Sequence, residues 1–363
     1  MFKFNRRFDK AIICIGLSCL LATQAISAND IKVSTIVDGL ESPWAMAFLP
    51  NNDILVTERE GKLRLIKDSE LVEQAIVGTP DVFFEGQGGL LDVMLDADFN
   101  NNRTLYLSYA TGDRKANATQ LMSATLDGMT LNNKRILFTA SPMKATAHHF
   151  AGRIAQMVDG SLLLTVGDGF NYREQAQTLD NHFGKVIRIN QDGSPHADNP
   201  FLHTDNAKPE IWTYGHRNMQ ALTVVNGVVY ENEHGPRGGD EVNIIKPGLN
   251  YGWPIITYGI DYNGAQITPF TEYQGIQQPA LDWTPSIAPS SMTYHNGYLY
   301  VTSLAEKSVR KLSIHDDQIT DKGIVFKQLN TRMRDISSGP DGALYILTDG
   351  ANASLLKVSQ AAK

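Results

Sequence analysis

A histidine and an aspartate lie at the two ends of one strand–turn–strand segment of the chain. His149 precedes the apolar run that starts at residue 150, and Asp168 follows nineteen positions later, between two glycines. Because the returning strand of a hairpin ends beside the start of the first strand, we expect these two side chains to meet. A carboxylate on one imidazole nitrogen leaves the other nitrogen available as a base. The spacing fits such a general-base pair and, equally well, a buried structural histidine that holds a turn carboxylate.

The stretch with the most unusual composition is residues 231–254, ENEHGPRGGDEVNIIKPGLNYGWP. Its glycines and prolines interrupt regular structure, and a loop this polar needs something to order it. Calcium is a natural choice, because it accepts carboxylate and backbone carbonyl oxygens in flexible geometry. An ordinary polar surface turn is the alternative interpretation of this stretch.

Two further segments offer hydrogen-bond donors for a flat or anionic ligand. Arg217 and Asn218 are adjacent in the segment YGHRN, where a guanidinium and an amide present planar arrays of donors. Gln87 lies between two glycines, where it is either a hydrogen-bonding side chain on a flexible loop or part of a simple turn.

A pair of arginines gives a second indication of an anionic ligand. Arg332 and Arg334 are two positions apart, so a strand would place both side chains on the same face. An anion between them would relieve their mutual repulsion. Salt bridges to nearby carboxylates, such as Asp335 or Glu241, would do the same.

Recurring strand patterns supply the elements that must position these residues. Six segments each combine an apolar strand, a tight polar turn and a second apolar strand; they cover residues 43–66, 89–110, 152–168, 220–236, 290–312 and 334–358. Such repetition favours an all-β fold, a six-bladed β-propeller of four-stranded antiparallel blades, over a β-sandwich or two all-β domains. The residues singled out above lie at matching ends of their repeats, which a propeller would bring to one mouth of its channel.

The composition is that of a soluble globular protein. Charged residues make up 20% of the 363 residues and hydrophobic residues 42%, with a formal net charge of −7. No cluster of basic residues indicates nucleic-acid binding, and no apolar stretch is long enough to span a membrane.

The first 28 residues have the pattern of a signal peptide: a positively charged start, an apolar core and a small-residue cleavage site. Residues 29–363 then form a single propeller domain, and we predict a periplasmic or secreted protein. Both cysteines, Cys14 and Cys19, lie in the signal peptide, so the mature chain has no thiolate nucleophile. Lipid anchoring at Cys19 is disfavoured, because Gly16 occupies a position where a large aliphatic residue is usual.

Taken together, these stretches resemble the soluble dehydrogenases of aldoses and glucose that depend on pyrroloquinoline quinone (PQQ), which are six-bladed propellers of the bacterial periplasm. The resemblance covers essentially all of residues 31–358. Its most specific part is the order of three motifs, GKVIRINQDGS, YGHRN and HGPRGGDE. Other matching stretches are SPWAMAFLP, GQGGLLDVMLDADF, HFAGR, GDG, NYGWP and RMRDISSGPDGALYILTD.

The resemblance implies roles for individual residues. It implies that His149 is the catalytic base, that Asp168 orients it, and that Arg217 donates to the reacting quinone oxygen. The residues it implies for PQQ binding are Gln87, Arg217, Asn218, Ser286, Arg332 and Arg334. It further implies one calcium (Ca2+) on the backbone carbonyls of Gly235 and Pro236, and a second, structural calcium on Glu241 and Tyr251, with Asp261 and Tyr262 as looser matches.

The activity implied is oxidation of an aldose at C1 to the lactone. No haem or flavin motif is present, so electrons would pass to an external acceptor, and the protein would be a monomer or homodimer. One alternative is a propeller that has lost PQQ and binds a sugar or protein, since Ala305 and His148 depart from the residues usual in glucose dehydrogenases. A calcium-dependent lactone hydrolase would need a ring of side-chain ligands in the channel, which the sequence lacks.

Overall fold

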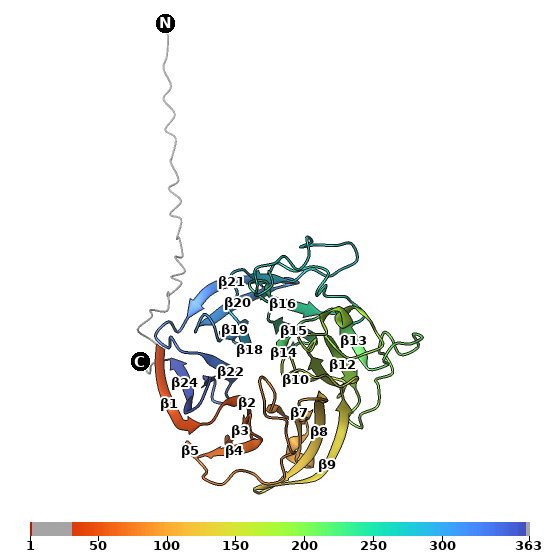
Figure 1. Ribbon diagram of the computed structural model, residues 1–363. Coiled ribbons are helices and arrows are strands. Elements are labelled where there is room, and N and C mark those ends of the chain that lie inside the picture. Colours follow the sequence, from red (N-terminus) through yellow and green to blue (C-terminus); the bar gives the residue numbers. More distant parts are fainter. Residues whose placement is uncertain (2–30, 361–363) are drawn as a thin grey trace.

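The protein is an all-β, six-bladed propeller, as the repeats predict. The computed structural model describes Met1 and residues 31–360, whose strands form six four-stranded sheets. These sheets are arranged as blades around a central channel (Figure 1). The predicted signal peptide, residues 1–28, lies outside the described residues apart from Met1. Within the described part, no helix is long and apolar enough to cross a membrane.

Five of the blades each consist of four consecutive antiparallel strands. Blade 1 contains β2 (Pro43–Phe48), β3 (Ile54–Glu58), β4 (Lys62–Lys67) and β5 (Glu70–Leu71). Blade 2 contains β6 (Leu90–Leu95), β7 (Thr104–Gly112), β8 (Asn117–Asp127) and β9 (Thr130–Thr139). Blade 3 contains β10 (Ala151–Gln156), β11 (Leu162–Val166), β12 (Lys185–Ile189) and β13 (Ile211–Tyr214). Blade 4 contains β14 (Met219–Val225), β15 (Val228–Glu233), β16 (Asp240–Ile245) and β17 (Leu281–Trp283). Blade 5 contains β18 (Pro289–His295), β19 (Tyr298–Ser303), β20 (Val309–His315) and β21 (Gln318–Val325).

Blade 6 joins the two ends of the described chain. It contains β22 (Met333–Ser338), β23 (Leu344–Thr348) and β24 (Ala353–Gln360), and its outer strand is β1 (Ile31–Leu40). The ladder between β1 and β24 runs from the pair Ile31–Gln360 to the pair Leu40–Ala353. Two short helices, α1 (Phe99–Asn102) and η2 (Arg173–Gln177), lie in connections between strands.

The tight turns of the repeats have the backbone geometry that their sequences require. In blade 4, Asn226 and Gly227 have φ of 51° and 82°, and in blade 5, Asn296 and Gly297 have φ of 47° and 85°. Two successive residues with positive φ match the twist of a hairpin, and Asn-Gly adopts this conformation at the least cost. The turns therefore fix the register of the inner two strands of these blades.

The same register recurs at the inner edge of every blade. Each innermost strand starts with one paired residue and is then interrupted by a bulge; the pairs are Pro43–Glu58, Leu90–Tyr109, Ala151–Val166, Met219–Glu233, Pro289–Ser303 and Met333–Thr348. A bulge redirects the side chains beside it. Residues next to these pairs are therefore delivered to the same end of the channel, whichever blade they belong to.

The middle of the channel is filled by the side chain of Arg153 from β10. Its guanidinium donates to the Gln220 and Ser290 carbonyls at 2.6 and 3.0 Å, and lies 4.0 Å from the centre of the Trp44 ring. Two carboxylates, Asp335 at 3.1 Å and Asp92 at 3.5 Å, complete its surroundings. These five partners come from the innermost strands of the other five blades.

Candidate functional site

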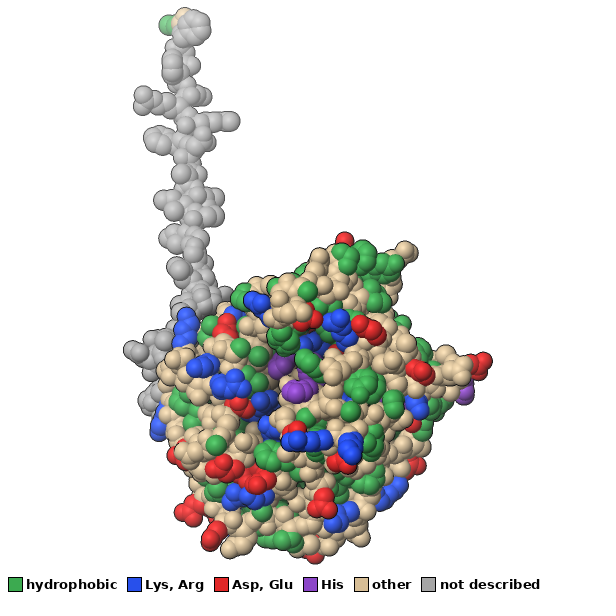
Figure 2. All heavy atoms as spheres, viewed as in Figure 1, with side chains coloured by type: hydrophobic (Ala, Val, Ile, Leu, Met, Phe, Trp, Pro, Cys, Tyr) green, Lys and Arg blue, Asp and Glu red, His purple; other side chains and the backbone are tan. Residues whose placement is uncertain are grey.

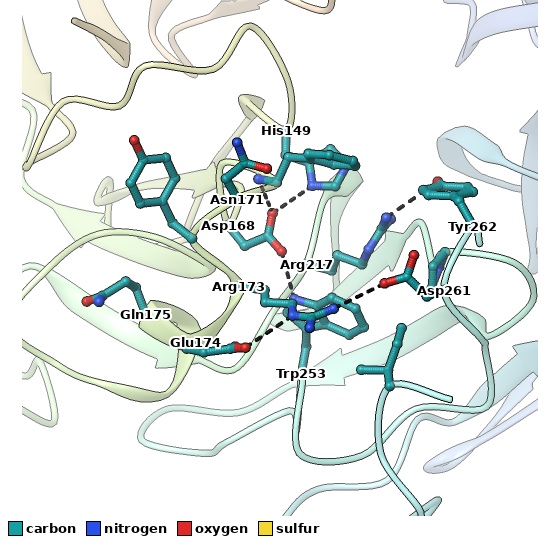
Figure 3. A pocket seen from close by; sticks show the side chains of 14 residues that line it. His149, Asp168, Asn171, Arg173, Glu174, Gln175, Arg217, Trp253, Asp261 and Tyr262 are labelled. Carbon is teal, nitrogen blue, oxygen red and sulfur yellow. Dashed lines mark hydrogen bonds and ion pairs between the residues drawn. The ribbon is translucent and has the colours of Figure 1, made fainter. Parts of the chain in front are cut away.

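His149 and Asp168 meet at the mouth of the channel, as the hairpin argument predicts. The distance from His149 Nδ1 to Asp168 Oδ1 is 2.6 Å, and both side chains are buried. In Figure 3 the imidazole and the carboxylate face each other at the wall of a cavity. Since Nδ1 is engaged by the carboxylate, Nε2 is the ring nitrogen that can accept a proton from a ligand.

Asp168 is held by more than its histidine. Its Oδ1 also accepts from the backbone N–H of Phe170 at 2.8 Å, and its Oδ2 accepts from the indole N–H of Trp253 at 2.7 Å. Trp253 belongs to the NYGWP motif, but no sequence pattern predicts its contact with Asp168. Three donors on one buried carboxylate keep the acid ionised and fixed in position.

The local electrostatics favour a neutral histidine beside an ionised aspartate. Burial lowers the pKa of His149 below its ordinary value, and the neighbouring Asp168 only partly opposes this shift. Although burial acts to raise the pKa of Asp168, His149 and the hydrogen bonds to the carboxylate leave that pKa below its ordinary value. A neutral imidazole on an anionic carboxylate is the protonation state that a general base requires.

The backbone around His149 is constrained. His149 has a φ of 51°, a conformation uncommon for residues with a side chain, and its N–H donates to Gln87 Oε1 at 2.7 Å. A Cβ on Gly167 would lie 2.3 Å from the His149 carbonyl oxygen, so only glycine allows the two segments to approach this closely. Gln87, predicted as a cofactor contact, thus holds the backbone of the predicted base.

A cavity of about 540 Å³ opens in front of this pair. Asn171, Glu174 and Gln175 line one side of it, and Asp261 and Tyr262 line the other (Figure 3). Tyr172, Arg173 and Trp253 also belong to its lining. On this face of the molecule, histidine and basic side chains gather near the centre (Figure 2).

Arg217 connects this cavity to the HGP loop, residues 234–236. Its Nη1 donates to the carbonyls of His234 and Gly235, both at 2.9 Å, and its guanidinium lies over the ring of Trp253 at 5.2 Å. Its carbonyl accepts from the N–H of Asp168 at 2.8 Å. Pro236 also lines the cavity. The predicted base, its carboxylate, Arg217 and the predicted calcium-binding carbonyls therefore lie together.

Beside this cavity, a second one of about 210 Å³ extends into the channel and is rich in arginine. Its polar lining consists of Arg59, Gln87, Asn218, Gln220, His234, Arg332 and Arg334. Three of the predicted cofactor contacts besides Gln87, namely Asn218, Arg332 and Arg334, are among these residues.

Arg332 and Arg334 share one carboxylate, Asp349, which lies just after β23. The two guanidinium groups contact its two oxygens at 2.8 and 2.9 Å. The predicted alternative partners do not pair with them: Asp335 faces Arg153, and Glu241 lies among other acidic residues. One carboxylate between two guanidinium groups leaves a net positive charge in the channel.

Ser286 is the one predicted PQQ contact that lines neither of these two cavities. Its hydroxyl donates to Asp240 Oδ2 at 2.5 Å, and Asp240 Oδ1 accepts from the Gly235 N–H at 2.8 Å. Ser286 and Asp240 therefore support the HGP loop.

A buried acidic cluster lies behind the HGP loop, in the wall between blades 3 and 4. Asn243 Nδ2 contacts carboxylate oxygens of Glu231 and Glu241 at 3.2 Å each and of Glu233 at 3.5 Å. The Nδ1–H of His216 donates to Glu233 Oε1 at 3.0 Å. Oxygen or nitrogen atoms of His216, Glu231 and Glu233 lie within 4.8 Å of one another. Burial, followed by repulsion from Glu233, raises the pKa values of Glu231 and Glu241 well above their ordinary range.

The residues predicted for a second calcium are distributed over two places. Tyr251 lies beside the acidic cluster, with its ring stacked on His216 at 4.7 Å. Asp261 and Tyr262 instead line the large cavity in front of His149, where Asp261 is 3.4 Å from Arg173 Nη1. Glu241 lines a separate space of about 10 Å³, room for one particle the size of a water molecule.

Sequence reasoning missed Arg59, Asp349 and Trp253. Arg59 and Asp349 occupy equivalent positions in their repeats. Each directly follows the last residue of the second strand of its blade, the residue that pairs with the start of the innermost strand. Comparing equivalent positions of the six repeats would have found both. Trp253 lies in the long connection between β16 and β17, which has no equivalent in the other repeats.

Comparison with known proteins agrees with this fold. A family model described as glucose/sorbosone dehydrogenase matches residues 40–357. The chain belongs to this family. Its resemblance to PQQ-dependent sugar dehydrogenases, stated from sequence motifs alone, is thereby confirmed.

Individual members of the glucose/sorbosone dehydrogenase family match almost end to end. The aldose sugar dehydrogenase YliI of Escherichia coli (strain K12) is 37% identical, over 96% of this chain and 98% of that protein. The crystal structure of the soluble aldose sugar dehydrogenase from Escherichia coli in its apo form has a TM-score of 0.88 at 38% identity, covering 91% of this chain and 99% of that one. A PQQ-bound aldose sugar dehydrogenase from Streptomyces coelicolor has a TM-score of 0.75 at 26% identity, covering 91% and 98%.

Proposed function

We propose that this protein is an aldose sugar dehydrogenase that depends on PQQ and calcium. It would oxidise the sugar at C1 to the lactone and pass the electrons to an external acceptor, in the periplasm or outside the cell. The observation that supports this most strongly is the buried pair of His149 and Asp168, which faces a sugar-sized cavity beside an arginine-rich channel.

The channel residues suit PQQ, a flat quinone with three carboxylates. Arg332 and Arg334 share only Asp349, and Arg59 lies in the same cavity without an ion pair among the described residues. Unbalanced guanidinium groups in a partly buried space favour a ligand with several carboxylates. Gln87 and Asn218 add amide groups that can bind a planar ligand at its edge.

The loop and the acidic cluster suit calcium. The Gly235 carbonyl faces Arg217, and we assign it, with the Pro236 carbonyl, to the calcium at the cofactor. For a second calcium we assign Glu241 and Tyr251, because buried oxygens of Glu231 and Asn243 nearby have no hydrogen-bond partner within the part of the chain that the structure describes. Among the described residues, no lysine or arginine side chain forms an ion pair with Glu231, Glu233 or Glu241. Buried carboxylates are retained only when paired, protonated or bound to a metal.

The chain's own part in the reaction is proton transfer and positioning. His149 Nε2 would accept the proton of the C1 hydroxyl, and Asp168 would stabilise the imidazolium that forms. Arg217, next to the pair, would stabilise negative charge that develops on an oxygen beside it. PQQ supplies the two-electron acceptor for the hydride from C1, and calcium supplies a Lewis acid for it.

Reconstitution tests this proposal. The protein is purified without cofactor, PQQ and calcium are added singly and together, and reduction of a dye is followed with a panel of aldoses. We expect activity only when both are present. His149→Ala should abolish turnover and leave PQQ binding largely intact, so full activity of this variant would exclude His149 as the base. Failure of the wild-type protein to bind PQQ would support the binding-module alternative instead.

A further inference from the structure

Arg59 lies in the cofactor channel at a position that the six repeats share. It directly follows Glu58, the last residue of β3, just as Asp349 follows Thr348 of β23 in the neighbouring blade. It lines the same cavity as Gln87, Asn218, Arg332 and Arg334. Its neighbours are therefore the residues proposed to bind PQQ.

One edge of the Arg59 guanidinium holds the loop that contains Gln87. Nη2 donates to the carbonyls of Gly86 and Gly88 at 2.5 and 2.7 Å, and Nε donates to Gly88 at 3.1 Å. Between these two glycines, Gln87 accepts the N–H of His149 at 2.7 Å. A chain of hydrogen bonds thus runs from Arg59 through one short loop to the backbone of the predicted base.

The charge of Arg59 is not balanced locally. Its hydrogen bonds are to neutral carbonyls, and the nearby Asp349 is already shared by Arg332 and Arg334. Burial, and then repulsion from Arg334, lowers the pKa of Arg59. Three guanidinium groups therefore face one cavity, and a single carboxylate outside its lining, Asp349, pairs with two of them; an anionic ligand would stabilise this arrangement.

We propose that Arg59 is a third guanidinium of the PQQ site, which binds a carboxylate of the cofactor and also positions the Gln87 loop behind His149. This inference rests on the proposed function. It assigns two separable roles to one side chain. The charge of the guanidinium binds a carboxylate of the cofactor, and its N–H donors hold the loop that contains Gln87. It also supplies a positive charge to the cavity that Leu304 lines, directly before Ala305, the position that departs from the residue usual in glucose dehydrogenases.

Two substitutions separate these roles. Arg59→Gln removes the charge, whereas Arg59→Lys keeps the charge but replaces the planar fork of Nε and Nη2 by a single ammonium nitrogen. Lys62→Gln is the matched control, because it removes the same charge from the same blade at a side chain that is 50% exposed. PQQ affinity is measured by quenching of tryptophan fluorescence in the presence of calcium, independently of turnover.

We expect Arg59→Gln to raise the dissociation constant of PQQ by at least about tenfold, as for loss of a charge-assisted hydrogen bond. Arg59→Lys should change it by less than about threefold but lower kcat by about tenfold with the sugar KM unchanged. Lys62→Gln should match the wild type. Binding by Arg59→Gln within twofold of the wild type would overturn the cofactor role, and a wild-type kcat for Arg59→Lys would overturn the positioning role.

A measurement on the wild-type protein covers the case that Arg59→Gln does not fold. Phenylglyoxal modifies accessible arginines, and peptide mass mapping reports each site. PQQ should slow the modification of Arg59 as it does that of Arg332, and equal rates at Arg59 with and without PQQ would refute the contact. If PQQ protects no arginine and quenches no fluorescence in the wild type, it is the proposed function that fails.

Discussion

Replacing Asp168 by asparagine is the sharpest test of how the site works. The carboxylate receives three donors, from His149 Nδ1, the Phe170 N–H and Trp253 Nε1. An amide has one acceptor oxygen and one NH₂ group in place of two acceptor oxygens. In one orientation its NH₂ group faces the indole N–H of Trp253. In the other it faces Nδ1 and the Phe170 N–H, and it forces His149 into the tautomer whose Nε2 carries a proton.

The size of the effect follows from these two orientations. A buried donor left facing another donor costs about 1–3 kcal/mol. The wrong tautomer removes the base, and either way no anion stabilises the imidazolium. We therefore expect kcat to fall by about 10²–10⁴-fold, the range typical of a lost general base. The affinity for PQQ should change little, because Asp168 does not line the arginine-rich cavity.

The assay is dye reduction by protein reconstituted with PQQ and calcium, with PQQ binding and thermal unfolding measured on the same samples. A double variant sharpens it. In Asp168→Asn combined with Trp253→Phe, the competing indole donor is gone, so the amide oxygen is free to face Nδ1 and restore the correct tautomer. This double variant should be more active than Asp168→Asn alone. If Asp168→Asn retains more than a tenth of the activity, or if Trp253→Phe lowers its activity further, the tautomer argument is wrong.

Two further predictions concern pH and calcium. Because burial lowers the pKa of His149, the neutral imidazole persists to more acidic pH, and kcat/KM should start to fall only below about pH 6.5. If kcat/KM already falls as the pH is lowered through 7.5, this protonation state is wrong. Calcium at 100 times its dissociation constant should stabilise the fold by about 2.7 kcal/mol, which raises the melting temperature by roughly 4 °C for a chain of this size. Glu241→Gln should reduce this calcium-dependent shift. It should not lower the melting temperature in the presence of chelator, because it removes repulsion among buried carboxylates. An unchanged calcium-dependent shift would exclude Glu241 as a ligand.

Much of the fold could be predicted from the sequence, because the signals that specify it are local. Turns such as Asn226-Gly227 and Asn296-Gly297 mark the hairpins, and alternation around them fixes which face is buried. Six such units determine a propeller, since a closed ring leaves few exposed sheet edges. The participation of β1 in blade 6 was not predicted, because nothing local in residues 31–40 identifies β24 as its partner.

The site was predictable to the extent that its residues lie at the ends of regular strands. The approach of His149 and Asp168 follows from one hairpin, and the common location of Asn218 and Arg334 follows from the repeat. The role of Trp253 and the places of Asp261 and Tyr262 depend on the path of the long connection between β16 and β17, for which no repeat provides a register. Side chains from that connection reached Asp168 and Arg173, contacts that only the folded chain reveals.

The side chain of Arg153 makes the stability of each blade depend on the others. Blades in a ring could in principle unfold one at a time, as the repeats of an open solenoid do. Here one guanidinium contacts all five other blades. If any one of these blades unfolded, the buried charge of Arg153 would lose one of its partners, which costs free energy. Local opening is therefore penalised at the centre of the ring as well as at the seam between β1 and β24. The molecule should lose its structure in a single cooperative step, and partly unfolded forms with five intact blades should be scarce.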